Sequence, residues 1–463
     1  MGGKTSRTRS ITGPAAIGAA ALACAILAAS CGGGSASTTV VQPITTPTAA
    51  SEVAAAVATP EMLPVTPVSI EYQIVDPAFE ALPGARAIYG AHEGSGYRIE
   101  VPDNWNGEVV YYAHGFRGNP PQLTVSFPPL RDYLIANGYA WAASSYSKNG
   151  YEPGAGARDT YALLDIFADQ VGAPERGYIY GQSMGGHVVS LSLEQYPAAY
   201  DGALSECGVV SGHDVLDYFL SWGALSGYFA GVDLRGVTQD AETFGTTIRG
   251  QIAPQLGPVD QPTAAGSAFA NVIKNLTGGE RPFFREGYAM NYAFNFAILV
   301  NAVANAGPSN AAAQNVDAVY EIDAGFGVTS AQLNRDISRI SANVMYRDAE
   351  RWPEFADLTG RIQSPHLTIH GTGDLFVPIS LEQRYREIVD AAGRGDLLVQ
   401  RAMRRPGHCA FSDEERMRAF VDLVTWVETG AQPAGDDLAG DLADVGRAFT
   451  QPLEEGDPGG IAP

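Results

Sequence analysis

The feature that most constrains the fold of this chain is an alternation of strand-like and helix-like segments that begins near residue 67. Short apolar stretches rich in Val, Ile and Tyr take turns with longer stretches that have helical spacing. Strands that alternate with helices in this way are typical of βαβ units, whose parallel strands are covered by helices on both faces. The sequence therefore predicts an α/β fold with a mostly parallel, doubly wound sheet.

Eight segments are expected to be strands of this sheet: 68–75, 97–101, 108–113, 139–145, 177–180, 202–207, 366–370 and 397–401. Five are expected to be its helices: 130–137, 159–171, 186–196, 381–392 and 414–428. A long interval from about 209 to 361 breaks the alternation and contains an apolar, helical run from 288 to 304. We interpret this interval as a large helical lid inserted between two strands of a single domain, which spans 67–430.

The stretch from Tyr178 to His187 has the pattern of a strand that turns sharply at Ser183 and continues into a helix. Gly181, Ser183 and Gly185 form a G-x-S-x-G. A serine that presents its hydroxyl above a sheet edge lies on a strained turn, where side chains two residues away on either side would collide with the neighbouring strand and helix. We therefore expect Ser183 to be a nucleophile.

Two loops downstream carry groups that suit the activation of this hydroxyl. A serine needs a base to take its proton, and the base needs a carboxylate to orient it. Asp374 ends a Gly-rich turn after the strand 366–370, and His408 lies on a Gly-bearing loop after the last strand. We expect Asp374 to be the acid and His408 the base. Glu206, at the end of an earlier strand, is the alternative acid.

These pieces, in this order and at strand ends, resemble the α/β-hydrolase superfamily; 181–186 and 371–374 are most similar to its esterase and prolyl-oligopeptidase-like branches. The resemblance covers roughly 68–430, apart from the lid. In that superfamily the oxyanion hole takes one backbone N–H from the residue after the nucleophile and one from a loop after an early strand. The resemblance therefore implies Met184 and Phe116 as the oxyanion hole.

The N-terminus resembles a bacterial lipoprotein leader. Three basic residues precede an apolar run from about 15 to 29, which is the plan of a secretory signal peptide and is shorter than the roughly 20 residues that span a membrane. The resemblance implies a signal peptide at 1–30 and acylation of Cys31, so that the protein is extracytoplasmic and anchored by lipid. Simple secretion, with Cys31 incidental, is the alternative.

Two segments outside the domain have a biased composition. Residues 31–66 are rich in Ser, Thr, Ala and Pro and have few large apolar side chains. Such a segment cannot repay its ordering entropy, and we expect a disordered linker. Residues 431–463 are an acidic, Gly/Pro-rich tail, which is either solvated or a strap that lies over the domain.

The formal net charge of −22 argues against a nucleic-acid partner and against electrostatic binding to anionic lipid. A membrane contact is expected only through the lipid anchor. The sequence shows no metal-ligand spacing and no nucleotide-binding glycine loop. We therefore predict no metal and no cofactor.

Of the four cysteines, Cys24 and Cys31 lie in the leader, so only Cys207 and Cys409 are left to pair after export. An exported protein folds in an oxidising compartment. We predict a disulfide between Cys207 and Cys409 that holds the loop of His408 against the sheet. Two free buried thiols are the alternative.

Residues on the loop near the serine and aromatic residues in the lid are candidates for an apolar acyl or aryl pocket, and the lid's own core is the alternative role for the second group. The first group is Tyr146, Lys148, Asn149 and Tyr151; the second is Phe283, Phe284, Tyr288, Tyr292, Phe294 and Phe296. His114, His187 and His370 do not follow the last strand, so we expect them to be packing groups or groups that support the reacting residues from behind, and not bases.

The residues and the resemblance together predict an extracytoplasmic serine hydrolase that cleaves carboxylic esters, small or polymeric, through an acyl-enzyme. A peptidase or amidase with the same triad is the nearest alternative. An alternative of another class is a catalytically inactive, lipid-tethered binding protein of the same fold.

Overall fold

The structure is a computed structural model that describes residues 61–62, 70–234, 240–304, 308–348 and 357–452. The predicted signal peptide, Cys31 and most of the predicted linker lie outside the described residues. Within the described ranges, no helix is both long enough and apolar enough to cross a membrane.

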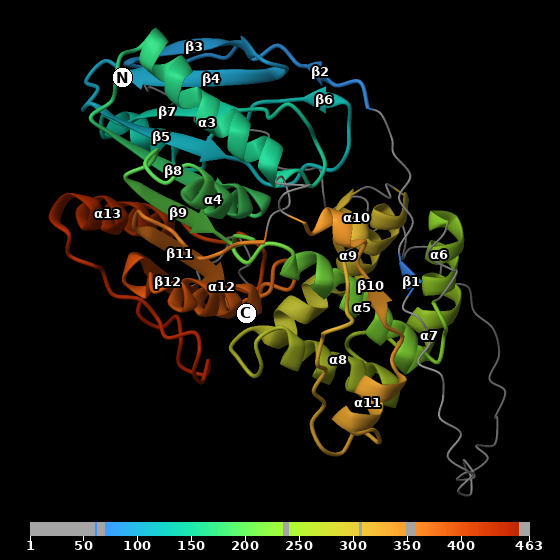
Figure 1. The fold of residues 1–463 in the computed structure, drawn as a ribbon. Coiled ribbons are helices and arrows are strands. Elements are labelled where there is room, and N and C mark those ends of the chain that lie inside the picture. Colours follow the sequence, from blue (N-terminus) through green and yellow to red (C-terminus); the bar gives the residue numbers. More distant parts are fainter. Residues whose placement is uncertain (1–60, 63–69, 235–239, 305–307, 349–356, 453–463) are drawn as a thin grey trace, which may run out of the picture. The chain divides into compact units, whose positions relative to one another are not determined.

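An eight-stranded sheet forms the centre of the domain (Figure 1), in the spatial order β12-β11-β9-β8-β5-β7-β4-β3. Its strands are β3 (Ala85–His92), β4 (Ser95–Pro102), β5 (Glu108–Ala113), β7 (Ala140–Ser144), β8 (Arg176–Gln182), β9 (Gly202–Glu206), β11 (His366–Gly371) and β12 (Leu398–Met403). All neighbours from β7 to β12 pair in parallel, whereas β4 pairs antiparallel with both β3 and β7. The predicted α/β class with a mostly parallel sheet is confirmed.

Helices cover both faces of the sheet, because its central strands are apolar on both sides. Along β5, Val109 and Tyr111 pack into one core, and Val110 and Tyr112 pack into the other. The first core contains side chains of α3 (Pro153–Gln170), α4 (Met184–Gln195) and α12 (Ser380–Ala391); the second contains side chains of α2 (Arg131–Ala136) and α13 (Asp413–Thr429). This alternation is the two-residue period of a strand buried on both faces.

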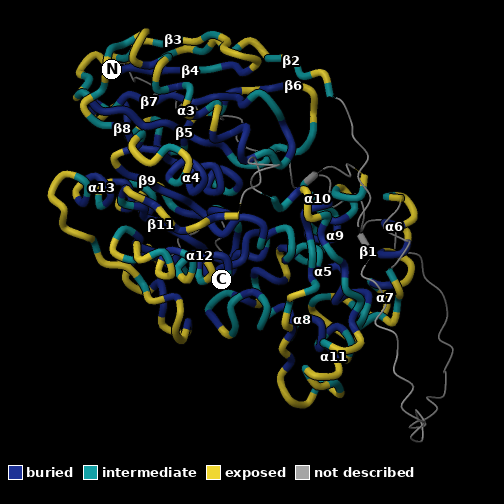
Figure 2. Tube along the Cα trace, in the orientation of Figure 1, coloured by how far each residue is buried: buried dark blue, intermediate teal, exposed yellow. Residues whose placement is uncertain are grey.

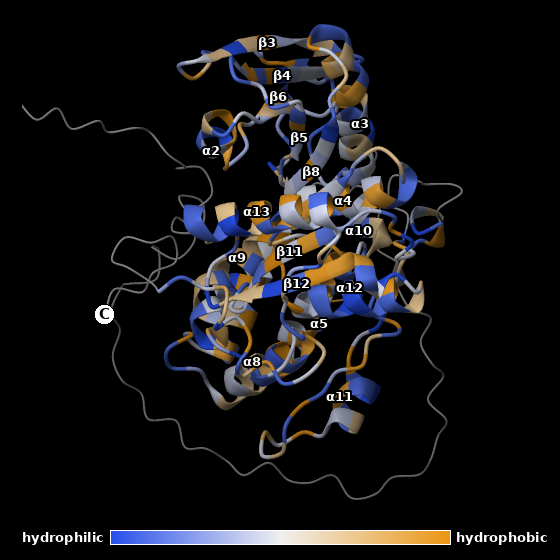
Figure 3. Ribbon diagram, turned by 90° about the vertical axis from the view of Figure 1, so that its left-hand side faces the viewer, coloured by the Kyte–Doolittle hydropathy of each residue, from blue (hydrophilic) through white to orange (hydrophobic). Residues whose placement is uncertain are grey.

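The outer elements of the domain are only partly buried, and local sequence features fit their positions. Figure 2 shows β5 and β9 as buried and much of β3 as exposed or intermediate, as expected for an edge strand. Figure 3 shows mostly hydrophilic residues on α12, whose buried residues are Leu381, Glu382, Tyr385 and Val389. Helix α13 begins with a capping box between Ser412 and Glu415, an arrangement that satisfies two otherwise unpaired backbone donors.

A helical insertion separates β9 from β11. Its α-helices are α5 (Asp214–Ala230), α6 (Ala241–Thr247), α7 (Ala253–Leu256), α8 (Ala264–Leu276), α9 (Phe284–Ala304), α10 (Pro308–Ala312) and α11 (Ser330–Asp336). They lie together to one side of the sheet in Figure 1, and side chains of α5, α6, α8, α9 and α11 share a hydrophobic core of their own. The predicted helical run 288–304 is the greater part of α9.

Several predicted elements differ from the structure at the edges of the domain. In place of a strand over 68–75, the described part contains only the two-residue β2 (Gln73–Ile74), paired with β6 (Gln122–Leu123). Strand β3 was not predicted, because a half-exposed edge strand lacks a continuous apolar run. Helix α3 begins at Pro153 and not at residue 159, because proline suits the first turn of a helix.

The segment after α13 follows the outer edge of β12. Its backbone N–H at Asp436 donates to the carbonyl of Gln400 (2.8 Å), and the carboxylate of Asp436 accepts from the N–H of Ala402 (2.8 Å). Leu438, Leu442, Val445 and Phe449 are buried there. We call residues 431–452 the C-terminal strap. At the other terminus, two residues of the predicted linker form β1 (Glu61–Met62), which pairs with β10 (Ile340–Ser341).

Candidate active site

Ser183 lies at the junction of β8 and α4, in a backbone conformation with φ 56° and ψ −121°. This left-handed conformation is strained for a residue with a side chain. A Cβ atom at Gly181 would lie 2.2 Å from the carbonyl oxygen of Gly185, and one at Gly185 would lie 2.1 Å from that of Ala113. The two glycines of the pattern are therefore required by the close approach of strand and helix.

The loop after β5 passes directly beside this serine. A Cβ atom at Gly115 would lie 3.1 Å from the Cβ of Ser183, so a side chain there would push the loop and the serine apart by a few tenths of an ångström. Phe116 follows in the loop, and Met184 is the first residue of α4, where backbone N–H groups have no partner within the helix. Phe116, Ser183 and Met184 line the same cavity.

The structure brings the three predicted triad residues together. The Nδ1–H of His408 donates to Oδ2 of Asp374 (2.6 Å). Since an ionised carboxylate only accepts, this bond places the proton of a neutral imidazole on Nδ1 and leaves Nε2 as an acceptor. The hydroxyl of Ser183 donates to that Nε2 (2.9 Å). The hydroxyl is thus in contact with a base whose tautomer is correct for accepting its proton.

The carboxylate of Asp374 is fully buried and held at both oxygens. Its Oδ1 accepts from the backbone N–H groups of Phe376 (2.9 Å) and Val377 (3.0 Å). Burial alone raises the pKa of Asp374, but its contact with His408, the charge of His370 and the N–H of Val377 outweigh burial, so its pKa lies below the ordinary value. Asp374 is therefore ionised at neutral pH.

A second histidine lies behind this carboxylate. The Nε2–H of His370 donates to the carbonyl of Val377 (2.7 Å), and its Nδ1–H donates to Oε1 of Glu382 (3.2 Å). Both partners are acceptors, so His370 is an imidazolium, and its Nε2 lies 3.9 Å from Oδ2 of Asp374. Burial lowers the pKa of His370, but Glu382, Asp374 and the Val377 carbonyl outweigh burial and raise its pKa above the ordinary value.

Glu206, the alternative acid, is engaged elsewhere. It accepts from the hydroxyl of Tyr180 (2.6 Å) and from Nε2 of Gln182 (2.7 Å), and its Oε2 pairs with Nε of Arg416 (3.1 Å). The structure therefore places Asp374, and not Glu206, against His408.

Two other histidines make packing contacts, as expected. The ring of His114 stacks on Tyr146 with centroids 3.9 Å apart, and burial lowers the pKa of His114 to about 3. Nδ1 of His187 lies 3.0 Å from the hydroxyl of Tyr151, and burial lowers the pKa of His187 to about 3 as well. Both rings are therefore neutral.

Cys207 and Cys409 are joined by a disulfide with a Cα–Cα distance of 5.2 Å. The pairing is the one predicted, and it links the end of β9 to the residue after His408. Cys207, His408 and Cys409 are also the cluster of potential metal ligands in the described part of the chain. The two sulfurs are bonded to each other and both ring nitrogens of His408 are engaged, so this cluster does not suit a metal ion.

The helical insertion holds the loop that carries Asp374, a feature that the sequence analysis missed. The carbonyl of Leu375 accepts from the hydroxyl of Tyr218 on α5 (2.7 Å) and from Nδ2 of Asn295 on α9 (3.0 Å). The carbonyl of Thr372 accepts from Nε of Arg281 (2.6 Å). Polar residues in otherwise apolar helices were the available signal.

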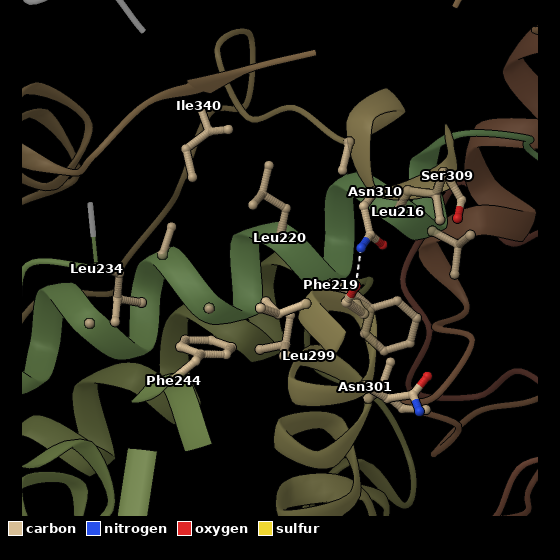
Figure 4. Close-up of a pocket in the computed structure, with 18 of the residues that line it drawn as sticks. Leu216, Phe219, Leu220, Leu234, Phe244, Leu299, Asn301, Ser309, Asn310 and Ile340 are labelled. Atoms are coloured by element: carbon tan, nitrogen blue, oxygen red, sulfur yellow. Dashed lines mark hydrogen bonds between the residues drawn. The ribbon is translucent and has the colours of Figure 1, made fainter. Parts of the chain in front are cut away.

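The cavity beside Ser183 is lined mainly by residues that the sequence analysis did not single out. Of the predicted pocket residues in the loop after β7, Tyr151 lines the cavity. The aromatic residues predicted in the lid do not line it: Phe284, Tyr288 and Phe296 are buried in the core of the insertion, as in the alternative role. Among the helices, α5 and the second half of α9 contribute most to the lining (Figure 4).

Comparisons with known proteins find distant similarity. The chain is 22% identical over 409 residues to an o-phthalyl amidase of Xanthobacter agilis, in a match that covers 75% of this chain and 88% of the relative. No family model matches the chain.

Among solved structures, an esterase from Aspergillus oryzae shares 14% identity with a TM-score of 0.40, over 75% of this chain and 80% of its own. An acylaminoacyl peptidase of Pyrococcus horikoshii shares 12% identity with a TM-score of 0.37, over 77% and 44%. Likenesses at this level identify neither a reaction nor a substrate. By its own strand order, its serine turn between β8 and α4 and its helical insertion before β11, the chain has the α/β-hydrolase fold.

Proposed function

We propose that this protein is a serine hydrolase that cleaves carboxylic esters. The observation that carries the proposal is the continuous hydrogen-bond chain from the hydroxyl of Ser183 through the imidazole of His408 to the buried carboxylate of Asp374. Three groups from three separate loops are aligned as nucleophile, base and orienting acid. The similarity to an o-phthalyl amidase is consistent with hydrolysis.

In the proposed reaction, Oγ of Ser183 attacks the ester carbonyl carbon while Nε2 of His408 takes the hydroxyl proton. The backbone N–H groups of Met184 and Phe116 stabilise the oxyanion that forms on the carbonyl oxygen. The C–O bond to the alcohol then breaks, and His408 returns the proton to the leaving alkoxide. Water repeats the sequence on the acyl-enzyme, releases the carboxylic acid and regenerates Ser183.

We favour esters over peptides as substrates because of the cavity beside Ser183. An extended peptide carries a polar amide group at every residue, and leaving such groups without partners in an apolar cavity is unfavourable. Most of the residues that line the cavity are apolar. An amidase that acts on a small apolar amide is the second candidate, and the amidase relative favours it.

The proposal is tested by labelling with a fluorescent fluorophosphonate and by hydrolysis of p-nitrophenyl acetate. We expect wild type to label and Ser183→Ala to lose activity on the order of 10⁶-fold, as when a triad nucleophile is removed. Ser190→Ala, on the same helix, is the matched control, because the hydroxyl of Ser190 donates back to the carbonyl of Gly186 and contacts none of the three proposed triad residues. Well-folded wild type that does not label would favour the inactive binding protein instead, and faster cleavage of acetyl p-nitroanilide than of the ester would favour the amidase.

We further propose that the protein acts outside the cytoplasm and is anchored through Cys31. The Cys207–Cys409 disulfide is consistent with an oxidising compartment, and the leader pattern supplies the route of export. In a bacterial host, Cys31→Ala should move the protein from the membrane fraction to the soluble extracytoplasmic fraction. The same distribution for wild type and variant would instead support simple secretion.

A further inference from the structure

The cavity that begins at Ser183 continues into the helical insertion. Its volume is about 420 Å³, within the range of cavities that hold small organic ligands. Figure 4 shows Leu216, Phe219 and Leu220 on α5 facing the cavity, with Leu299 and Phe244 across from them and Leu234 toward its far end. The cavity is therefore an extended apolar space and not a shallow surface depression beside the serine.

Helix α5 gives this space the form of a trough. Gly223, Gly227 and Gly231 follow at intervals of one turn and line the cavity together with Ala224. These small residues let apolar side chains approach the helix, since a Cβ at Gly223 would lie 3.4 Å from Leu299 and one at Gly227 would lie 3.0 Å from Leu234. The cavity is lined by this face of α5 together with the larger apolar side chains around it. From Leu216 to Gly231 this face is about 22 Å long, at about 1.5 Å per residue.

The near end of the trough adjoins the triad. The ring of Phe219 on α5 lies 5.7 Å from the ring of Phe376, centroid to centroid, and Phe376 lies edge-on to the imidazole of His408 at 4.8 Å. One substrate molecule can therefore place its carbonyl at Ser183 and an attached group in the trough. The shape suits a long unbranched chain attached to the ester.

The charge of the lining further restricts the chemistry of the molecule that can occupy the trough. The described residues that line the cavity include the carboxylates of Asp233 and Asp336 and no Lys, Arg or His. Asp336 is paired with Arg335, and an ionised group buried among the apolar side chains of the trough would lose its hydration, which is unfavourable. The part of the occupant that lies in the trough is therefore uncharged.

We propose that the trough along α5 binds the acyl chain of an uncharged ester, so that the substrates are esters of long-chain carboxylic acids. This inference rests on the proposed function, because it takes Ser183 as the acceptor of the acyl group. The trough contributes binding energy that grows with each buried methylene until the chain reaches the far end.

The first test is a series of p-nitrophenyl esters from acetate to decanoate, below the concentrations at which they form micelles. For wild type we expect kcat/KM to rise about two- to fourfold for each added methylene. A flat or falling series would overturn the inference. A parallel series of acetate esters with longer alcohols checks the direction, because a rise with the alcohol and not with the acid would refute the assignment of the trough to the acyl chain.

The second test fills the trough with Gly223→Leu. A Cβ at Gly223 would meet only Leu299 at 3.4 Å, an ordinary contact, and leucine is a better helix former than glycine. We expect the ratio of kcat/KM for decanoate to that for acetate to fall at least tenfold. Gly250→Leu is the matched control, because Gly250 is exposed and a Cβ there has no neighbour within 4 Å. An equal ratio in both variants would overturn the inference.

A binding measurement separates this inference from the proposed function. Ser183→Ala should bind a fluorescent methyl ester of a long-chain acid, and Gly223→Leu in the same background should weaken that binding at least tenfold. Binding that Gly223→Leu weakens, in a protein that does not react with fluorophosphonates, would leave the trough in place and refute catalysis. Labelling without chain-length dependence and without binding would refute the trough alone.

Discussion

At the scale of single residues, the site is held by charges buried behind the groups proposed to react. The imidazolium of His370 lies between the carboxylates of Glu382 and Asp374, and all three side chains are fully buried. Burial raises the pKa of Glu382, but the hydrogen bonds and charge of His370 and its other donors outweigh burial and lower its pKa below the ordinary value. The pair therefore stabilises the fold in a manner that depends on pH.

Glu382→Gln tests this dependence through urea unfolding at different pH values. Removing one partner of a buried ion pair costs about 3–5 kcal/mol, and we expect a loss of that size near pH 6. The raised pKa of His370 gives stability that is fully present below its unfolded pKa of about 6.5 and is lost as the pH rises through the folded pKa. The lowered pKa of Glu382 gives stability that is lost only as the pH falls below about 4.3.

The difference in unfolding free energy between wild type and Glu382→Gln should therefore be larger at pH 6 than at pH 9. Glu387→Gln on the same helix is the control, because its ion pair with Arg384 is exposed and exposed pairs contribute little. A difference that is constant from pH 6 to pH 9 would show that His370 is not charged in the folded protein.

At the scale of secondary-structure elements, the insertion between β9 and β11 does more than cover the serine. Helix α5 supplies one wall of the cavity and, through Tyr218, a hydrogen bond to the loop of Asp374. Helix α9 supplies Asn295 to the same carbonyl, and its Gly287 lies against Gly373, where an added Cβ would meet the carbonyl oxygen at 1.6 Å. The helices and the acid loop therefore form one packed unit.

Asn295→Leu tests whether this contact positions Asp374. The variant removes the donor to Leu375 and leaves a buried carbonyl with one fewer partner, a loss of about 1–3 kcal/mol. We expect kcat for a short ester to fall about tenfold while KM stays the same, because the acid loop loosens and the cavity keeps its lining. Asn291→Leu is the control, since Asn291 donates only to the carbonyl of Gly287 within its own helix. A change confined to KM would contradict a positioning role.

Much of the central fold and of the triad follows from the sequence, for reasons that particular elements show. Strands β5 and β8 contain apolar runs buried on both faces, and Ser183 lies between glycines that the close approach of strand and helix requires. These signals are local in sequence. The structure then brings Asp374 and His408 to Ser183 as expected, because loops after parallel strands meet at one edge of the sheet.

The cavity could not be predicted in the same way. Its walls depend on how α5 and α9 pack in three dimensions. The sequence pattern of an apolar helix is the same whether the helix faces a core or a cavity. The aromatic residues of α9 were conspicuous in the sequence but lie mostly in the core of the insertion, whereas the glycines of α5 form the trough. Edge strand β3 was missed because it is half exposed.

At the scale of the whole molecule, the Cys207–Cys409 disulfide joins parts of the chain 202 residues apart. Replacing both cysteines with alanine should lower the free energy of unfolding by about 2–5 kcal/mol. Activity should fall as well, because Cys409 adjoins His408. The measurements are thermal unfolding and ester hydrolysis, with reductant-treated wild type for comparison. If the double variant kept both the stability and the rate of wild type, the disulfide would have no role in holding the His408 loop.

The C-terminal strap has a consequence for how copies of the protein behave together. Strand β12 is an outermost strand of the sheet, and a bare outermost strand offers its backbone to any neighbouring chain. Asp436 caps two of those backbone groups, and Thr450 accepts from the N–H of Arg404 just beyond the strand. A protein cut short before Asp436 would expose these backbone groups to strand addition, so we expect it to self-associate more readily than the full chain.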